Sequence, residues 1–348
     1  MGQNRAAYVL GLKEIKVSEA PMPICGDNEA IVKIAYCGVC GSDVHFYEQG
    51  EEAFPNVYPF ILGHECSGTV TEIGKNVKNL RVGDRVALEP GKACGECEWC
   101  KSGKYNLCPN VSFISAPVCN GAMRNYIAHP AGLCFKLPDN MSLMSGALIE
   151  PLAVGLHGAR QAEAGPGKTA VILGCGCIGL VTLLASKLYQ ADRVIMVDVF
   201  DIRLDKAREL GADYVVNSAR EDPVKAVMKL TNGLGADIVF ETAGNPVTTA
   251  MTGKLAKRGG VITLIGNTPG KTPFEFLEIM NKEITIKSVF RYRNIYPLAI
   301  EAISSGRLHI EGIVSRIFEL EDAKKAFDTA LTEKQSNVKI VLRIGHEE

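Results

Sequence analysis

Four cysteines lie close together in the segment GKACGECEWCKSGKYNLCPN, at Cys94, Cys97, Cys100 and Cys108. Their C-x2-C-x2-C-x7-C spacing can fill all four positions of a tetrahedral Zn2+, which leaves no position for water or substrate. An iron–sulfur cluster is the alternative, because a proline follows Cys108 as in bacterial ferredoxin runs, but those runs have three residues before the last cysteine. The spacing favours a structural zinc, so a working site must lie elsewhere.

A working zinc needs about three protein ligands and one open position. The suitable residue types are Cys40 and His45 in CGVCGSDVH, His64 and Glu65 in LGHECSG, and Glu150 in ALIEPLAVGLHG. Taken singly, each has an ordinary explanation: a small buried thiol, a core imidazole or a surface carboxylate. Because all of them lie near glycine-rich turns of one region, beside a predicted nucleotide fold, together they indicate a catalytic metal.

The segment VILGCGCIGLVTLL places Gly174, Gly176 and Gly179 as G-x-G-x-x-G between an apolar strand and a helical run. The next strand ends at Asp198, nineteen residues after the last glycine. In this context the glycines allow a tight turn, close approach of a pyrophosphate and helix–strand packing. Asp198 would accept hydrogen bonds from the adenosine ribose and repel a 2′-phosphate, which favours NAD over NADP, although Arg203 nearby could accommodate that phosphate.

The elements that must position these groups differ between two parts of the chain. Up to about residue 155, short alternating segments such as AIVKIAYCG and CSGTVTEIG predict a β-rich domain with long loops. From residue 168, the apolar strands TAVILG, RVIMVD, DIVFETAG and GGVITLIG alternate with helical runs that include VTTAMTGKLAKRGG. This alternation predicts a doubly wound parallel sheet, and the tail of the chain predicts a helix followed by a strand.

The composition excludes some classes of partner. A net charge of -1 and a pI near 6.6 give no positive field for nucleic acid or anionic lipid. Residues 169–186 are uncharged and long enough for a membrane helix, but the three glycines are better explained by a dinucleotide site. The N-terminal residues MGQNRAAYVL contain no apolar signal core, so we expect a cytoplasmic protein with reduced cysteines.

Several segments together resemble the zinc-dependent medium-chain dehydrogenases, and most closely the sorbitol or xylitol dehydrogenase branch. They are GVCGSDVHFYEQG, the stretch from YPFILGHECSG to GKYNLC, GALIEPLAVGLHG and SVFRYRN. The resemblance implies an α/β protein, with a Rossmann NAD-binding domain at 156–289 and a β-rich GroES-like catalytic domain formed by 1–155 and 290–348. It also implies a homotetramer.

The same resemblance assigns the metal ligands. The catalytic zinc falls on Cys40, His64 and Glu65, with Glu150 either binding the metal or holding its water, and the structural zinc falls on the four clustered cysteines. Alcohol dehydrogenases of the wider family have a cysteine where Glu150 stands, so the carboxylate favours the polyol branch.

The remaining roles are also implied by the resemblance. Ser42 and His45 resemble a proton relay to solvent, with a water near Glu150 as the alternative proton acceptor, and Asp43 would orient His64. The substrate contacts would be Phe46, Phe113, Arg291 and Tyr292, with Phe46 standing where some relatives have tyrosine. The NAD contacts would be Gly174, Gly176, Ile178, Gly179, Asp198 and Arg203.

The implied reaction is oxidation of a secondary hydroxyl of a polyol to the ketose, with hydride transfer to NAD. Threonine, butanediol and sugar-phosphate dehydrogenases are the alternatives within the family. A non-catalytic nucleotide-binding member is an alternative of another class, but such a protein would be expected to lose metal ligands first, and this chain retains all of them.

Overall fold

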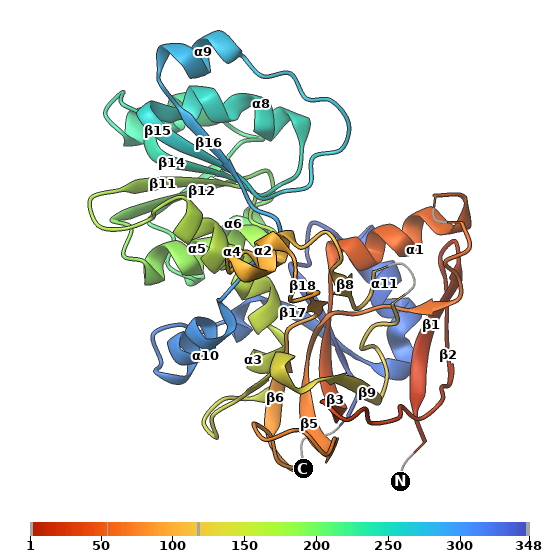
Figure 1. Ribbon diagram of the computed structural model, residues 1–348. Coiled ribbons are helices and arrows are strands. Elements are labelled where there is room, and N and C mark those ends of the chain that lie inside the picture. The colour runs from red at the N-terminus through yellow and green to blue at the C-terminus, as the bar shows by residue number, and fades with distance from the viewer. Residues whose placement is uncertain (1–2, 54, 117–118, 346–348) are drawn as a thin grey trace. The chain divides into compact units, whose positions relative to one another are not determined.

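The computed structural model describes residues 3–53, 55–116 and 119–345. The chain divides into two compact units, coloured mainly red to yellow and green to blue in Figure 1. The first unit comprises Met1–Glu150, Tyr296–Gly306 and Val314–Glu348, and the second comprises Pro151–Ile295 and Arg307–Ile313. Residues 151–155, 290–295 and 307–313, which we expected in the catalytic domain, therefore fall in the second unit.

A mixed sheet lies at the centre of the first unit, with the strand order β10-β6-β5-β3-β18-β17 and with β9 also paired to β3. β18 comes from the C-terminal tail and pairs directly with β3, so the tail completes a sheet begun by the N-terminal segment. The strands are β3 (Glu29–Val39), β5 (Glu65–Ile73), β6 (Arg85–Leu88), β9 (Tyr126–Pro130), β10 (Cys134–Lys136), β17 (Val314–Glu319) and β18 (Lys339–Arg343).

Smaller elements complete this unit. Helix α1 starts directly after β3, and the Tyr47 hydroxyl on α1 donates a hydrogen bond to Asp328 on α11 at 2.6 Å. The helices are α1 (Gly41–Ala53), α2 (Glu98–Lys101), α3 (Leu143–Ala147), α10 (Tyr296–Ser304) and α11 (Ala323–Thr332). The remaining strands are β1 (Arg5–Gly11), β2 (Glu14–Glu19), β4 (Phe60–Ile61), β7 (Gly91–Lys92) and β8 (Ser112–Phe113).

The second unit contains a six-stranded parallel sheet with the order β13-β12-β11-β14-β15-β16. All five residues of β11, TAVIL, are buried, as expected for a parallel strand covered on both faces. The strands are β11 (Thr169–Leu173), β12 (Arg193–Asp198), β13 (Tyr214–Asn217), β14 (Ala236–Glu241), β15 (Ala256–Leu264) and β16 (Thr285–Ser288). The doubly wound sheet predicted from the sequence is confirmed.

Helices follow the strands of this sheet at the predicted spacing. Asp222 and Asn245 cap α7 and α8 by accepting backbone N–H bonds from Val224 and Val247, at 2.9 and 2.8 Å, and a proline follows each cap. The helices are α5 (Cys177–Leu188), α6 (Asp201–Glu209), α7 (Pro223–Leu230), α8 (Pro246–Leu255) and α9 (Phe276–Asn281).

One helix is shorter than the sequence predicted. We expected it to run through VTTAMTGKLAKRGG, but α8 ends at Leu255, and Ala256 has extended angles (φ −76°, ψ 139°) and begins β15. The residues that follow include Gly259 and Gly260, which disfavour a helix. Pairing of Ala256 with Ala236 on β14 supplies the backbone with a partner in the extended form instead.

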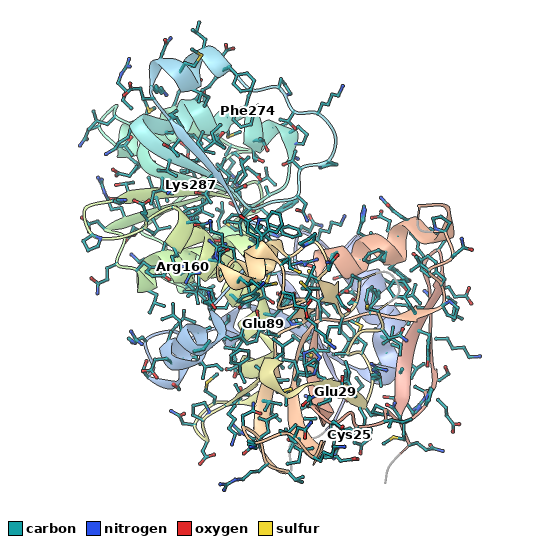
Figure 2. The ribbon with its side chains drawn as sticks, viewed as in Figure 1. Cys25, Glu29, Glu89, Arg160, Phe274 and Lys287 are labelled. Carbon is teal, nitrogen blue, oxygen red and sulfur yellow. The ribbon has the colours of Figure 1, made fainter. Side chains whose placement is uncertain are left out.

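No helix within the described residues is long and apolar enough to cross a membrane. The apolar stretch 169–186 instead forms β11 and most of α5. Helix α4 (Ile149–Gln161) enters the second unit, where its C-terminal end is tied to β16. Lys287 on β16 donates to the Gln161 carbonyl at 2.7 Å and pairs with Glu163 at 2.8 Å (Lys287 is labelled in Figure 2).

We expect Gly179→Ala to destabilise the fold, because a Cβ atom at this position would lie 1.9 Å from the Gly174 carbonyl oxygen. Overpacking of this kind costs about 1–3 kcal/mol of unfolding free energy. Urea unfolding without nucleotide measures it. Gly176→Ala is the control, because its Cβ would meet only the Arg203 guanidinium, at 3.9 Å. Equal unfolding midpoints for the two variants would show that the close contact does not matter.

Candidate metal and dinucleotide sites

The four-cysteine loop, residues 94–108, lies between β7 and β8. These short strands pair with each other, Gly91 with Phe113 and Lys92 with Ser112, so the two ends of the loop are held side by side. Cys97 immediately precedes α2, and Cys108 follows a short 3-10 helix, Tyr105–Leu107. The loop thus folds back on itself and brings its four sulfur atoms together.

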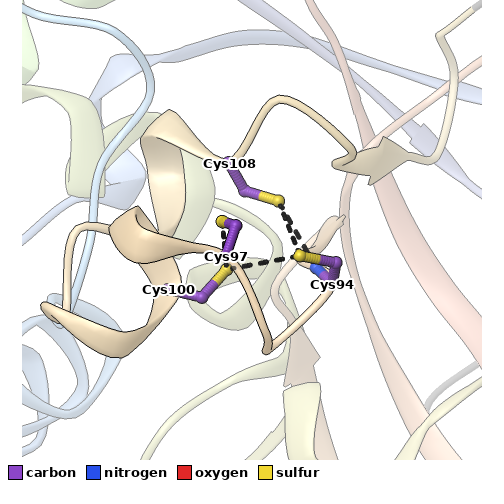
Figure 3. Close-up of side chains that lie close together, drawn as sticks. All are labelled: Cys94, Cys97, Cys100 and Cys108. Carbon is purple, nitrogen blue, oxygen red and sulfur yellow. Dashed lines mark hydrogen bonds between the residues drawn. The ribbon is translucent and has the colours of Figure 1, made fainter.

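The sulfur atoms are spaced as a metal site requires (Figure 3). They lie 3.4 Å apart for Cys97 and Cys100, 3.5 Å for Cys94 and Cys108, and 4.0 Å for Cys94 and Cys100. A tetrahedron with Zn–S bonds of ~2.3 Å has sulfur–sulfur edges of about 3.8 Å. Backbone hydrogen bonds from Glu96 and Cys97 lower the pKa of Cys94 to about 6, whereas desolvation raises that of Cys100 to about 12, so the thiolate form is favoured at Cys94 and not at all four sulfurs before a metal binds. These residues fit a closed zinc site.

The second cluster is formed by the pairing of β3 with β5. Cys40 directly follows β3, His64 directly precedes β5, and Glu65 begins β5 opposite Gly38. The ligand atoms of Cys40, His64 and Glu65 all lie within 4.8 Å of one another. His64 is 6% exposed and Glu65 is 1% exposed. A thiolate, an imidazole and a carboxylate that converge in this way fit a zinc with one position left open.

The buried carboxylate of Glu65 has a cationic partner on its other side. Lys339, the first residue of β18, forms an ion pair with Glu65 and donates to the Val39 carbonyl oxygen at 3.0 Å. Lys339 is itself buried, and a buried charge without a partner would be costly. The C-terminal tail therefore contributes directly to the environment of this cluster.

Gly38 is a residue of this site that sequence reasoning missed. A Cβ atom at this position would lie 2.0 Å from Glu65 Oε2 and 3.1 Å from Lys339 Cε. Only glycine at this position of β3 leaves room for the side chains of Glu65 and Lys339. The sequence contained a signal, because a glycine within a buried strand often marks the close approach of another group.

Helix α1 separates the residues that follow Cys40 onto two faces. Ser42 and His45 are both exposed and lie about one turn apart, so they share one face of the helix. Asp43 is buried on another face. Phe46 is half-buried and packs edge-on against Phe60, with the ring centroids 5.6 Å apart. The predicted relay residues thus face solvent, whereas Phe46 is also part of the packing of the unit.

Asp43 and Phe113 both lie against His64. The Asp43 carboxylate is 3.5 Å from His64 Nδ1, and the Phe113 ring centroid is 5.4 Å from that of the imidazole. Burial alone would raise the pKa of Asp43, but the nearby His64 imidazole and hydrogen bonds from the Ser115 hydroxyl and the Cys40 amide lower it. Asp43 is therefore held as a carboxylate that faces Nδ1, which leaves Nε2 for a metal.

Glu150 is buried at the start of α4 but does not belong to the cluster of Cys40, His64 and Glu65. The charge of Glu150 acts on a second carboxyl, that of Glu89, which sequence reasoning missed. Burial, with a contribution from the charge of Glu150, raises the pKa of Glu89 to about 7 even though the Tyr105 hydroxyl donates to it at 2.9 Å. Glu89, labelled in Figure 2, directly follows β6. A single glutamate has no spacing to other ligand residues that could have identified it from the sequence.

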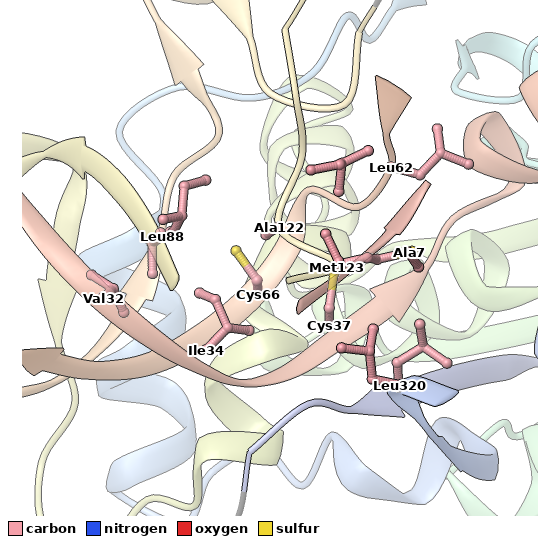
Figure 4. Close-up of a cluster of buried hydrophobic side chains, with 14 of the residues drawn as sticks. Ala7, Val32, Ile34, Cys37, Leu62, Cys66, Leu88, Ala122, Met123 and Leu320 are labelled. Carbon is pink, nitrogen blue, oxygen red and sulfur yellow. The ribbon is translucent and has the colours of Figure 1, made fainter. Parts of the chain in front are cut away.

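Two further cysteines of the first unit, Cys37 and Cys66, are packing residues. Cys37 and Cys66 face each other across β3 and β5 in the hydrophobic core (Figure 4). Burial raises the pKa of both thiols, so neither is a reactive thiolate. Cys175, in the glycine-rich turn of the second unit, is fully buried, and its thiol pKa is raised in the same way.

The glycine-rich turn joins β11 to α5 as predicted. Gly174 has a left-handed φ of 101°, and Gly179 packs so closely beneath it that no side chain fits. Gly176 precedes α5 and has no side chain to cap the helix, so its first N–H groups are not satisfied by a capping side chain. Ile178 is half-buried in that first turn. This arrangement can hold a pyrophosphate at the helix N-terminus.

Asp198 lies at the end of β12, beside this turn. Its Oδ2 accepts the Cys175 N–H at 2.6 Å, and its Oδ1 accepts the N–H groups of Val199 and Phe200 at 2.8 and 3.0 Å. The three amides hold the carboxylate in place, with its remaining lone pairs available to a ligand. The Arg203 guanidinium lies 5.5 Å from the centroid of the Phe200 ring, two residues after Asp198.

The remaining predicted substrate residues lie in the second unit, after β16. Arg291 has a left-handed backbone (φ 55°), and its guanidinium is 4.7 Å from the Phe290 ring centroid. Tyr292 is buried. A non-glycine residue held in this conformation is uncommon and is often associated with a functional position.

Two family descriptions match the chain. Residues 26–139 match the alcohol dehydrogenase GroES-like domain, and residues 177–305 match the zinc-binding dehydrogenase family. A sorbitol dehydrogenase from Bacillus subtilis is 37% identical over 340 residues, which cover 97% of this chain and 96% of that protein.

Solved structures agree over the whole length. An Escherichia coli oxidoreductase/dehydrogenase of unknown specificity is 44% identical, with a TM-score of 0.96 over 99% of this chain and all of that chain. A Sinorhizobium meliloti zinc-binding dehydrogenase bound to NADP is 29% identical, with a TM-score of 0.92 over 99% and 100% of the two chains. An E. coli alcohol dehydrogenase complexed with NADH is 26% identical, with a TM-score of 0.91 over the same shares.

These matches confirm the fold expected from the sequence, a GroES-like domain with a Rossmann-type domain. The chain belongs to the zinc-dependent medium-chain dehydrogenases, in the branch that contains the sorbitol dehydrogenases.

Proposed function

We propose that this chain oxidises a secondary hydroxyl of a polyol of the sorbitol or xylitol type to the ketose, and transfers the hydride to NAD. The observation that carries the proposal is the buried convergence of Cys40, His64 and Glu65 within 4.8 Å. The sequence similarity to a sorbitol dehydrogenase supports the choice of a polyol. The chain is proposed to act in the cytoplasm as a homotetramer.

Two zinc ions per chain are part of the proposal. Cys40, His64 and Glu65 would hold the catalytic zinc, and Cys94, Cys97, Cys100 and Cys108 the structural one. Zinc bound at the open site would polarise the substrate hydroxyl, and NAD would accept the hydride from the carbon that bears it. Glu150 lies outside the three-residue cluster, which supports the reading in which it holds a water rather than binding the metal directly.

Side chains of this chain would carry away the proton of the substrate hydroxyl and keep the His64 imidazole in its orientation. Asp43 keeps His64 oriented through Nδ1. The hydroxyl proton would pass through the Ser42 hydroxyl to the His45 imidazole and then to solvent, because both side chains lie on the exposed face of α1. Phe113 would cover the apolar side of the reacting carbon beside His64. Hydride and proton together account for the two hydrogens that the carbinol loses.

Selectivity for a polyol would come from donors beyond the reacting carbon. Arg291 and Tyr292 supply a guanidinium and a phenol, and Phe46 would contribute an apolar contact. A site built to hydrogen-bond hydroxyl groups discriminates strongly against a substrate that lacks them, because its polar groups are then left unpaired. Gly174, Gly176, Ile178, Gly179, Asp198 and Arg203 would bind NAD, with Asp198 on the ribose hydroxyls.

The first prediction separates the two zinc ions. Cys40→Ser should abolish turnover and remove one zinc while leaving the urea midpoint near wild type, because the open site is held by the sheet. Cys97→Ser should remove the other zinc and mainly destabilise its loop. Elemental analysis and unfolding curves measure both effects. Iron in the protein, or a fully active preparation with at most one zinc per chain, contradicts the assignment.

The second prediction concerns the nucleotide. Asp198→Ala should raise the kcat/KM for NADP relative to that for NAD. The change should correspond to about 1–3 kcal/mol of free energy, the scale of a hydrogen bond to a charged group. Asp198→Asn removes the charge at nearly the same side-chain size and should shift the ratio in the same direction; its one oxygen can still accept the N–H groups of Val199 and Phe200, but its NH2 group cannot accept that of Cys175. A wild-type preference for NADP would show that Asp198 is not the selector.

The third prediction tests the substrate. Initial rates on polyols, 2,3-butanediol, threonine, phosphorylated sugars and 2-propanol should favour sorbitol or xylitol over 2-propanol by orders of magnitude in kcat/KM. Arg291→Ala should remove most of this advantage without changing zinc content or NAD affinity. Arg208→Ala, an arginine exposed on α6 and paired with Asp205, is the matched control. Equal rates on 2-propanol or threonine would overturn the polyol assignment.

A further inference from the structure

The segment that follows the four-cysteine loop approaches the Cys40–His64–Glu65 site at two points. It begins with β8, and its Phe113 ring lies beside His64. Two residues later, the Ser115 hydroxyl donates a hydrogen bond to Asp43 Oδ1 at 2.6 Å. Nothing in the spacing of VSFISAP had singled out this serine.

Ser115 joins two parts of the site. Besides donating to Asp43, its Oγ accepts the backbone N–H of Gly63 at 2.8 Å, and Gly63 directly precedes His64. The same N–H is 3.3 Å from Asp43 Oδ1. The hydroxyl therefore fixes both the carboxylate that faces the imidazole and the backbone that carries the imidazole.

The rest of the Asp43 carboxylate is held on its other oxygen. The Cys40 N–H donates to Oδ2 at 3.0 Å, so two backbone amides and one hydroxyl orient the group. Asp43 is fully buried and Ser115 is 4% exposed, so water does not readily replace this hydroxyl. Of the hydrogen bonds described for Asp43, that of Ser115 is the shortest and comes from the only side-chain hydroxyl.

Ser115 is held in place at a cost. Its backbone is left-handed (φ 67°), a conformation that serine seldom adopts. The strained residue is bracketed by hydrogen bonds from its own N–H to the Cys119 carbonyl at 3.0 Å and from the Ala116 N–H to Phe113 at 3.1 Å. Local strain maintained by such a frame is characteristic of residues with a positioning task.

We propose that Ser115 is a positioning residue of the Cys40–His64–Glu65 metal site, where its hydroxyl fixes Asp43 and thereby the orientation of the His64 imidazole. The proposal rests on the zinc site of the proposed function, but it does not depend on the identity of the substrate. Groups that orient a metal-binding histidine in this way commonly change metal affinity 10- to 100-fold when removed, by the general range for such contacts.

The route to Ser115 also links the two clusters. The four-cysteine loop begins after β7 and returns to β8, and β7 pairs with β8 through Gly91 and Phe113. A metal that closes the loop therefore holds the start of the segment that carries Phe113 and Ser115.

The test is zinc retention by the full-length, zinc-loaded protein during titration with a chromophoric chelator, without substrate. Ser115→Ala and Ser115→Gly should both release one of two zinc ions at about 10- to 100-fold lower free chelator than wild type. Both variants lose the hydroxyl, but only glycine also relieves the left-handed backbone. The exposed Ser112, whose Oγ contacts Cys119 Sγ at 3.2 Å, provides Ser112→Ala as a matched control that should retain both ions.

Cys40→Ser identifies which ion is released, because it should retain only the zinc of the four-cysteine loop. If it still binds two zinc ions, the proposed metal site itself is wrong, independently of Ser115. Cobalt substitution reports on the geometry of the metal site itself, separately from the stability of the surrounding segment. The visible absorption of Co2+ at the Cys40 site should change in Ser115→Gly but not in Ser112→Ala. Wild-type zinc retention in both Ser115 variants, or weakening in Ser115→Ala alone, overturns the proposal.

Discussion

The antiparallel pairing of β3 and β5 is the constraint on which the candidate metal site depends. It places the end of one strand beside the start of the other, so that Cys40, His64 and Glu65 meet although they are separated by more than twenty residues in the chain. The absence of a side chain at Gly38 leaves space for the Glu65 carboxylate in this register. A shift of the register by one residue would turn these side chains to the opposite face.

The fold could be predicted because it depends on local pattern, and the four-cysteine group because it depends on spacing, whereas the choice of Cys40, His64 and Glu65 rested on the family resemblance. The parallel sheet follows from apolar runs such as TAVIL, and the four-cysteine loop from ligand spacing. The boundary of α8 could not be predicted in the same way, because the helix pattern of its last residues was overridden by pairing with β14. Propensity is a weak guide where a strand partner is available.

The supporting residues were less predictable than the ligands. Ser115 and Lys339 reach the site from a loop and a strand distant in sequence, Glu89 is buried near Glu150, and each belongs to a residue type that is common on surfaces. What distinguishes them is burial combined with a specific partner: Asp43 for the hydroxyl, Tyr105 for the carboxyl and Glu65 for the ammonium. Such partnerships arise only after the chain has folded, so a single sequence does not display them.

The position of Lys339 on β18 has a consequence for how the protein is made. The ribosome synthesises Glu65 early and Lys339 only after the entire second unit, and until then the Glu65 carboxylate has no ammonium to accompany it into the interior. Burying that carboxylate alone would be strongly unfavourable. Because β18 also pairs with β3, we expect the sheet of the first unit, and the surroundings of Glu65, to be completed only after the nucleotide domain has been translated.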